Sequence, residues 1–368
     1  MKLKRLQKRL LAAGMLSLGM TGVVHAADTL NVYNWSDYIA EDTLEKFEKE
    51  TGIKVTYDVY DSNEVLEGKL LAGSTGYDVV VPTIDFLARQ IQAGIYQPLQ
   101  KDKLKNYKEL DPAMMTRLSA LDPENTYAVP YMWGTTGIGM IESKVIERLG
   151  EDAPLDSWDL VLKPENLAKL ADCGVAFLDA PSEIFGAVLH YQGKDPNSTN
   201  PKDYQGDALK LLKELKPSIT YFHSSKYIDD LAAGEICVAV GWSGDVAQAM
   251  AAAEEADNGV EITYLIPKEG ALQWFDMFAI PKDAKNVDAA LKFIDFMTRP
   301  DIAAANTNYI WYPNPVPASV PMVDKEITSD PGIYPPQEVM DKLWAAKVMP
   351  PKIDRVMTRA WTEVKTGK

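Results

Sequence analysis

Three tryptophan–carboxylate pairs, far apart in the sequence, are the residues best suited to bind a charged ligand. They are Trp35 with Asp37, Trp242 with Asp245, and Trp274 with Asp276. A tryptophan ring attracts cations through its π face, and a carboxylate accepts strong hydrogen bonds from ammonium groups. If the fold brings the pairs together, they predict one site for a ligand that carries several ammonium groups.

The ends of strands must position these pairs. Trp35 follows an apolar run at 30–34, and Trp242 follows the β-branched run at 238–240. Trp274 opens the apolar run that comes after it. Open α/β sheets bind ligands at the carboxyl ends of their strands, so this placement favours a shared cleft.

Residues 30–99 alternate between strand and helix patterns, which predicts a parallel β-α-β-α-β sheet. The expected strands cover 30–35, 53–60 and 77–81, and the expected helices cover 42–50, 62–71 and 86–93. Asp85 could cap the last of these helices. No glycine-rich phosphate-binding motif follows the first strand, so a nucleotide site is not supported.

A second alternating region covers residues 141–240, further helices and strands follow up to residue 297, and two more helices are expected near the C-terminus. The expected strands cover 175–178, 236–240, 260–266 and 277–280, and the expected helices cover 182–190, 204–215, 227–233, 246–256, 286–297, 336–347 and 354–363. Between the two regions, the glycine-rich run 131–140 fits either a hinge strand that crosses between lobes or a tightly packed strand. The pattern therefore predicts an α/β fold of two lobes that enclose a cleft.

The first 26 residues have the features of a secretory signal. A basic segment with five Lys and Arg residues precedes the apolar run 10–24, and small residues end at Ala26. This predicts a Sec-type signal peptide, cleavage after Ala26 and a periplasmic protein. No later apolar stretch is long enough to span a bilayer, so direct membrane insertion is not expected.

The charge of the chain points to cationic partners. Its formal net charge is −15, and removal of the five basic residues of the signal would make it −20. This balance argues against nucleic acid and anionic lipid as partners, although an acidic surface also simply keeps exported proteins soluble. His190 and His223 are scattered, so neither a metal site nor a cofactor is expected.

Cys173 and Cys237 are the two cysteines of the chain, and both lie in the exported part. In an oxidising compartment such a pair favours a disulfide over two free thiols. A bridge across a loop of that length stabilises the fold by about 4 kcal/mol in the chain-entropy model.

Several site candidates also have a purely structural explanation. Asp245 could cap the helix that starts at Val246, and Glu183 could stabilise a helix N-terminus through the helix dipole. Thr83 and Ser224 follow strands and could each make one hydrogen bond to a ligand.

Four segments carry a resemblance to a known family. They are 31–39 (NVYNWSDYI), 76–83 (GYDVVVPT), 131–138 (YMWGTTGI) and 241–245 (GWSGD). Through them the whole mature chain resembles the periplasmic polyamine-binding proteins of ABC transporters, especially the putrescine/spermidine-binding subfamily. The resemblance implies a monomeric, non-enzymatic binding protein that captures a polyamine and delivers it to a membrane permease.

The same resemblance implies a type II-like two-lobed fold, in which each lobe has a mixed, mostly parallel sheet flanked by helices. Lobe 1 would comprise 27–135 and about 250–310, and lobe 2 about 136–249 and 311–368. The residues implied to line the cleft are Trp35, Ser36, Asp37, Tyr38, Thr83, Glu183, Ser224, Trp242, Asp245, Trp274, Asp276 and Tyr312. The acids among them would hold the amines, and Trp35, Trp242, Trp274 and Tyr312 would sandwich the aliphatic chain. The family also pairs its two cysteines.

Two positions depart from the putrescine-preferring members, which tend to carry Phe at Trp274 and Ser at Thr83. With the nearby acid Asp85, these departures favour spermidine over putrescine. Two alternatives are a sugar-binding protein of the same architecture and a glycosidase-like enzyme with paired carboxylates. The candidate set contains no Arg or Lys, which suits a cation better than a sugar, and no nucleophile–base pair is evident.

Overall fold

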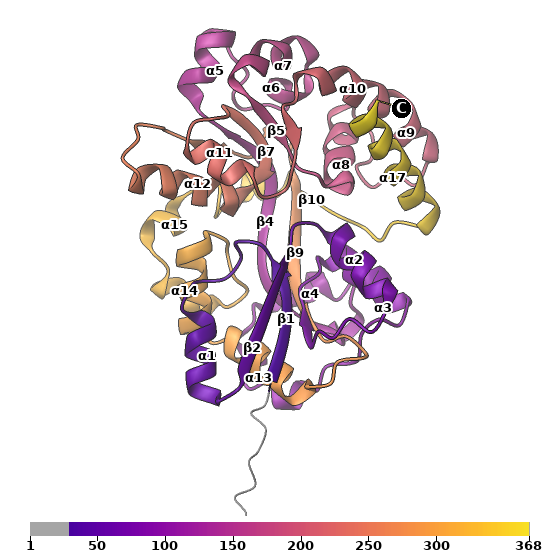
Figure 1. The fold of residues 1–368 in the computed structure, drawn as a ribbon, viewed down its shortest axis with the longest axis vertical. Helices are drawn as coiled ribbons and strands as arrows, with labels where there is room; N and C mark the ends of the chain where they lie inside the picture. Colours follow the sequence, from indigo (N-terminus) through magenta and orange to yellow (C-terminus); the bar gives the residue numbers. More distant parts are fainter. Residues whose placement is uncertain (1–28, 368) are drawn as a thin grey trace, which may run out of the picture.

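The computed structural model describes residues 29–367, so the predicted signal peptide and its cleavage site lie outside the described residues. The chain forms two halves, one above the other in Figure 1, with long strands running through both. The sheet order is β2-β1-β3-β9-β4-β7-β5-β6, with β8 paired to β4 and β10 paired to β9. The two-lobed α/β class expected from the sequence is therefore confirmed.

The strands differ widely in length, and β4 and β9 are the longest. The strands are β1 (Thr29–Trp35), β2 (Lys54–Tyr60), β3 (Val79–Val80), β4 (Ala128–Met140), β5 (Val175–Phe177), β6 (Tyr221–Phe222), β7 (Val238–Trp242), β8 (Thr263–Leu265), β9 (Leu272–Ala279) and β10 (Trp344–Ala345).

Helices cover both faces of the sheet in each half (Figure 1). The lower half contains α1 (Thr43–Thr51), α2 (Asn63–Ala72), α3 (Ile84–Gln92), α4 (Pro112–Leu118), α13 (Val287–Met297) and α14 (Pro300–Ile310). The upper half contains α5 (Glu142–Leu149), α6 (Asp159–Leu162), α7 (Pro164–Leu170), α8 (Pro181–Tyr191), α9 (Pro201–Gln205), α10 (Asp207–Leu215), α11 (Tyr227–Ala232), α12 (Ser243–Glu255) and α17 (Pro351–Thr366). The remaining short helices are α15 (Lys325–Ser329), α16 (Gln337–Met340), η1 (Lys101–Lys103), η2 (Tyr107–Glu109), η3 (Pro123–Asn125), η4 (Ala171–Cys173), η5 (Lys216–Ser218) and η6 (Pro317–Met322).

The β-α-β-α-β unit predicted at the N-terminus is present. β1 pairs in parallel with β2 and with β3. Gly52 ends α1 in the left-handed conformation, and the side chain of Ser62 caps α2 by accepting a hydrogen bond from the Val65 amide. These local signals turn the chain after each element, so the carboxyl ends of β1 and β3 lie at one edge of the sheet.

β4 and β9 form the antiparallel pair that connects the two halves. Their register runs from Ala128 opposite Ala279 to Thr136 opposite Leu272, and β4 then pairs with β7. A Cβ atom at Gly134 would lie 2.6 Å from the Trp274 ring, so this glycine leaves room for that indole. The run 131–140 therefore passes between the halves and also packs tightly, and its role as a hinge stays a prediction.

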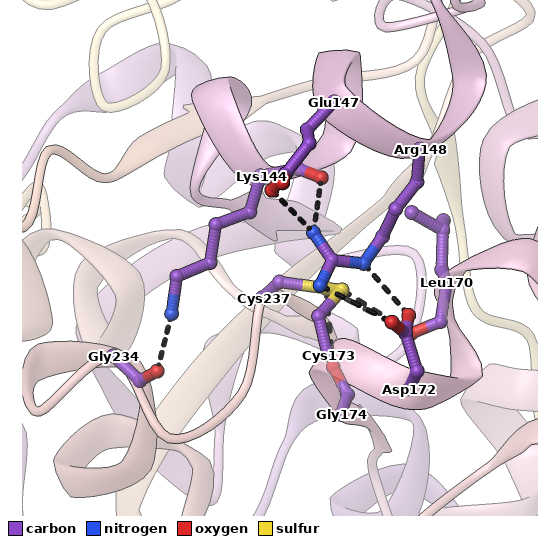
Figure 2. Close-up of polar contacts among 9 residues, drawn as sticks. All are labelled: Lys144, Glu147, Arg148, Leu170, Asp172, Cys173, Gly174, Gly234 and Cys237. Carbon is purple, nitrogen blue, oxygen red and sulfur yellow. Dashed lines mark hydrogen bonds and ion pairs between the residues drawn. A yellow bond between two sulfur atoms is a disulfide. The ribbon is translucent and has the colours of Figure 1, made fainter.

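The predicted disulfide between Cys173 and Cys237 is confirmed. Figure 2 shows it beside the side chain of Arg148, which reaches from α5 to the carboxylate of Asp172. Cys173 lies just before β5 and Cys237 just before β7, and these two strands pair in parallel. The bridge therefore fixes the start of β7, the strand that ends at Trp242.

Several predicted boundaries were wrong. The helix expected at 336–347 is only the four-residue α16, followed by β10, because Trp344 and Ala345 pair with the first residues of β9. The helix expected at 204–215 is split at Gly206, whose φ and ψ of −99° and −121° are not helical. The helix α14 was missed, although Pro300 in its first turn is a recognised start signal.

Two predicted caps were also wrong. α3 begins at Ile84, so Asp85 lies inside its first turn. α12 begins at Ser243, so Asp245 also lies inside a first turn and does not cap the helix. Within residues 29–367, no helix is both long and apolar enough to cross a membrane.

Candidate functional site

A cavity of about 320 Å³ brings together most of the predicted residues. Its lining combines aromatic rings, hydroxyl groups and carboxylates. The lining residues are Trp35, Ser36, Tyr38, Thr83, Glu183, Trp242, Asp245, Trp274, Asp276 and Tyr312. All ten belong to the predicted set, and only Asp37 and Ser224 are missing from the lining.

Both halves of the molecule contribute to this cavity. From the lower half, Trp35 ends β1 and Thr83 directly precedes α3. From the upper half, Glu183 lies in the first turn of α8 and Trp242 ends β7. Asp276 lies within β9, so the strand expected to begin at Met277 in fact starts earlier, at Leu272. The cavity is therefore framed by strand ends and helix N-termini, as expected for an α/β cleft.

Asp245 is held by two tyrosines. The hydroxyl of Tyr312 donates to Oδ1 at 2.6 Å, and the hydroxyl of Tyr227 donates to Oδ2 at 2.8 Å. Burial raises the pKa of Asp245 to about 7, while the two tyrosine hydrogen bonds oppose this rise. Both oxygens thus have a hydrogen-bond donor, and each can accept a further hydrogen bond from a ligand.

Glu183 is held by one side chain from β4 and one from β7. Thr136 Oγ1 donates to Oε2 at 2.5 Å, and Trp242 Nε1 donates to the same oxygen at 2.9 Å. Burial raises the pKa of Glu183 to about 7, and the nearby Asp85 raises it further. Because both donors contact Oε2, the other carboxylate oxygen is left for another partner.

Asp276 is the most deeply buried acid of the cavity, because the whole residue is only 3% exposed. Its Oδ2 accepts a hydrogen bond from the Tyr38 hydroxyl at 2.8 Å. Burial raises its pKa well above the ordinary value. Among residues 29–367, Oδ1 is one of the few buried polar atoms without a partner, and Thr83 Oγ1 and Trp274 Nε1 at the same cavity are two others. Unpaired buried polar groups are costly, so they mark a place for a ligand or water.

The aromatic rings contact one another edge to face. The Trp35 and Trp242 rings are 5.5 Å apart between centroids at 80°, and the Trp274 and Tyr312 rings are 5.2 Å apart at 61°. In this arrangement Trp35 and Trp242 are not parallel plates with a gap between them. They form a wall of the cavity, and Trp35 is fixed there by a hydrogen bond from Nε1 to the Val81 carbonyl at 2.8 Å.

Asp37 and Ser224 lie outside the lining. Asp37 is exposed, has a φ of 53°, and accepts a hydrogen bond from Ser225 Oγ at 3.3 Å. This contact joins the loop after β1 to the loop before α11, across the two halves. Ser224 is buried and its Oγ accepts a hydrogen bond from the Asp179 amide at 3.1 Å, so its hydroxyl has a structural partner.

A second cavity, of about 430 Å³, adjoins the first. The two share Thr83, Glu183 and Trp274. The second one adds the acid Asp85, whose pKa burial raises. A ligand longer than the first cavity could therefore continue past Trp274 towards Asp85.

Thr136 and Tyr227 were not predicted, although each holds a cavity carboxylate. Thr136 lies inside a run interpreted as a hinge, and Tyr227 lies 18 residues from Asp245 at the start of a separate helix. Thr136 lies in the segment 131–138 that carries the family resemblance, but nothing local to either residue indicates its acid, because each reaches that acid only through the tertiary fold. Within the described part of the chain, no group of His, Cys, Asp and Glu is arranged to hold a metal ion.

The two-lobed fold and the acidic cleft between its halves define the class of extracellular solute-binding proteins. The family model described as "Bacterial extracellular solute-binding protein" matches residues 42–335. The chain belongs to this family.

Relatives with higher similarity give a narrower comparison. The chain is 58% identical to the putrescine-binding periplasmic protein PotF of Escherichia coli K12, with 97% of each chain covered. It is 56% identical to the putrescine-binding periplasmic protein SpuD of Pseudomonas aeruginosa UCBPP-PA14 over the whole of both. A solved structure from Listeria monocytogenes, described as a spermidine/putrescine ABC transporter, superposes with a TM-score of 0.84 at 34% identity, covering 93% of this chain and all of that one.

These comparisons bear out the resemblance read from the four sequence segments. They also confirm the expectation that the chain is not an enzyme, because the relatives are substrate-binding proteins of transport systems.

Proposed function

We propose that this protein binds a polyamine in the cavity between its halves and delivers it to the permease of an ABC transporter. One observation carries the proposal: Glu183, Asp245 and Asp276 line one cavity to which, among the described residues, no Lys, Arg or His side chain contributes. Two buried acids, Asp245 and Asp276, and the half-buried Glu183 have no basic partner in the cavity, which favours a cationic ligand, and the aromatic walls suit an aliphatic chain.

Putrescine is the ligand we propose first. The relatives at 58% and 56% identity are named putrescine-binding, whereas a relative named spermidine/putrescine-binding, from Escherichia coli K12, is 37% identical. Spermidine, which the sequence favoured, is the second candidate. It is supported by the adjoining cavity and its acid Asp85, which offers a place for a third amine.

Capture would take place in the periplasm after removal of a signal peptide ending at Ala26, and the protein would act as a monomer. We further propose the lobe division expected from the sequence: 27–135 with about 250–310, and about 136–249 with 311–368. The packing of α13 on β1, and of α17 on α8, α9 and α10, supports the assignment of these helices to opposite lobes.

Titration calorimetry with putrescine, spermidine and maltose tests the proposal. We expect micromolar or tighter binding of at least one polyamine, and no binding of maltose. Asp276→Asn should weaken putrescine binding about 10- to 100-fold, because a hydrogen bond to a charged group contributes roughly 1.5–3 kcal/mol. Asp288→Asn is the matched control, since Asp288 is exposed and pairs with Lys103 away from the cavity. Binding of maltose alone would overturn the proposal in favour of the sugar-binding alternative.

A separate substitution tests which of the two polyamines the protein prefers. Asp85→Asn should weaken spermidine binding and should not weaken putrescine binding, because Asp85 lines only the second cavity and its charge opposes the ionisation of Glu183. Equal losses for both ligands would contradict a third-amine site there.

A further inference from the structure

The two tyrosines around Asp245 make the same pair of contacts. Tyr227 donates to Oδ2 at 2.8 Å and accepts a hydrogen bond from the Trp242 amide at 3.0 Å. Tyr312 donates to Oδ1 at 2.6 Å and accepts from the amide of Asp245 itself at 3.0 Å. Tyr312 lines the cavity, whereas Tyr227 is fully buried behind it.

The backbone contacts fix the direction of both hydroxyl protons. Because an N–H group donates to each hydroxyl oxygen, the hydroxyl proton must point to another acceptor, and the carboxylate of Asp245 is that acceptor. Two donors aimed at one carboxyl group favour its ionised form, since a protonated acid would bring its own proton against one of them.

The glycines of the segment Gly-Trp-Ser-Gly-Asp make room for these rings. A Cβ atom at Gly241 would lie 2.6 Å from Cε2 of Tyr227, and one at Gly244 would lie 2.5 Å from the Tyr312 ring. Both distances are shorter than real side chains allow, and neither glycine has a positive φ. The two glycines are therefore explained by space for the tyrosines and not by backbone conformation.

We propose that Tyr227 is a positioning residue for ligand binding: from behind the cavity, it orients Asp245 and keeps it ionised for an ammonium group. The inference deepens the proposed function and rests on it. Gly241 serves the same purpose by admitting the tyrosine ring next to the strand end.

The charged groups around Asp245 oppose its ionisation. Burial has the largest effect and raises its pKa, and Asp37 from the loop after β1 and Glu183 from α8 raise it further. Tyr312 and Tyr227 lower it. Tyr38 is also close to Asp245, but its hydroxyl donates its hydrogen bond to Asp276 instead. Loss of the Tyr227 hydroxyl should therefore raise the pKa of Asp245 above about 7.

Tyr227→Phe removes only the hydroxyl, and its effect on binding should depend on pH. A rise of about one pKa unit would make putrescine binding roughly five- to tenfold weaker than wild type at pH 7, and less than about twofold weaker at pH 9. Taking the ratio to wild type at each pH cancels the titration of the other acids. Tyr204→Phe is the control, because Tyr204 is equally buried and its hydroxyl donates to the Ser198 carbonyl, far from Asp245.

A double-mutant cycle separates positioning from a general effect on the fold. In the Asp245→Asn background, Tyr227→Phe should change putrescine affinity less than about twofold, because the group it acts through is gone. An equal loss in both backgrounds, or a ratio to wild type that is the same at pH 7 and pH 9, would overturn the inference. Failure of the wild-type protein to bind putrescine or spermidine would instead refute the proposed function, so the two outcomes are distinguishable.

Discussion

Ligand binding at this site should release protons. Putrescine is a dication, and it would bind in a cavity whose acids are partly protonated before the ligand arrives. The pKa of Glu183 and that of Asp245 are each raised to about 7, so at pH 7 each acid carries about half a proton. Burial also raises the pKa of Asp276 well above the ordinary value.

The size of the release follows from these populations. An ammonium group within hydrogen-bond distance favours the ionised form of an acid and lowers its pKa. If Glu183 and Asp245 ionise fully, about one proton leaves per ligand at pH 7, and any proton that Asp276 loses adds to this number. The sign is fixed: the empty site binds more protons than the occupied site, so affinity rises as the pH rises through about 7, where Glu183 and Asp245 lose their protons.

Calorimetry in several buffers at pH 7 measures this release directly. The observed binding enthalpy should change linearly with the ionisation enthalpy of the buffer, with a slope of at least about one proton released per putrescine. Affinity should also fall by about tenfold or more between pH 7.5 and pH 6. A slope near zero together with a flat affinity over this range would refute the reasoning, because it would mean that the acids are ionised before the ligand arrives.

Two other predictions concern the scaffold. Replacing Cys173 and Cys237 together by Ser should lower the free energy of unfolding by about 4 kcal/mol, because the bridge closes a long loop; an unchanged urea midpoint would contradict this. Arg89 on α3 in the lower half forms an ion pair with Asp354 on α17 in the upper half at 2.7 Å, so Asp354→Asn should speed putrescine release several-fold in stopped-flow measurements by weakening the contact between the halves. Lys213→Met, which removes an ion pair from the same helix within one half, should leave the release rate unchanged.

Much of the site could be predicted because strand ends are encoded locally. The β-branched run before Trp242 and the apolar run before Trp35 specify buried strands, and parallel strands deliver their carboxyl ends to one edge. Asp37 shows where this logic stops. Its neighbour Trp35 lines the cavity, but the left-handed φ of 53° at Asp37 places it at the exposed rim beside Ser225. A sequence pattern predicts which residues follow a strand, and it does not predict how the following turn directs each side chain.

The residues that could not be predicted depend on contacts between distant segments. Tyr227 contacts Asp245 only because α11 packs on α12 and β7. Thr136 on β4 contacts Glu183 at the start of α8 although the two residues are 47 positions apart in the sequence. β10 was taken for helix because its two residues pair only with β9, over 70 positions away. In each case the deciding interaction is non-local, so the secondary-structure propensity and hydrophobic periodicity of the sequence do not predict it.

The segment Gly241 to Asp245 contains both kinds of information. Its apolar lead-in and its acid could be interpreted from the sequence as a strand that ends in a ligand site. The role of its glycines could not be predicted, because they are needed to leave space for two tyrosine rings behind the strand end. Since these rings supply the hydrogen bonds that oppose the burial of Asp245, the glycines affect the charge of the site without touching it. One five-residue segment thus contains both the acid that would hold an ammonium group and the two glycines that leave room for the tyrosines that favour its ionised form.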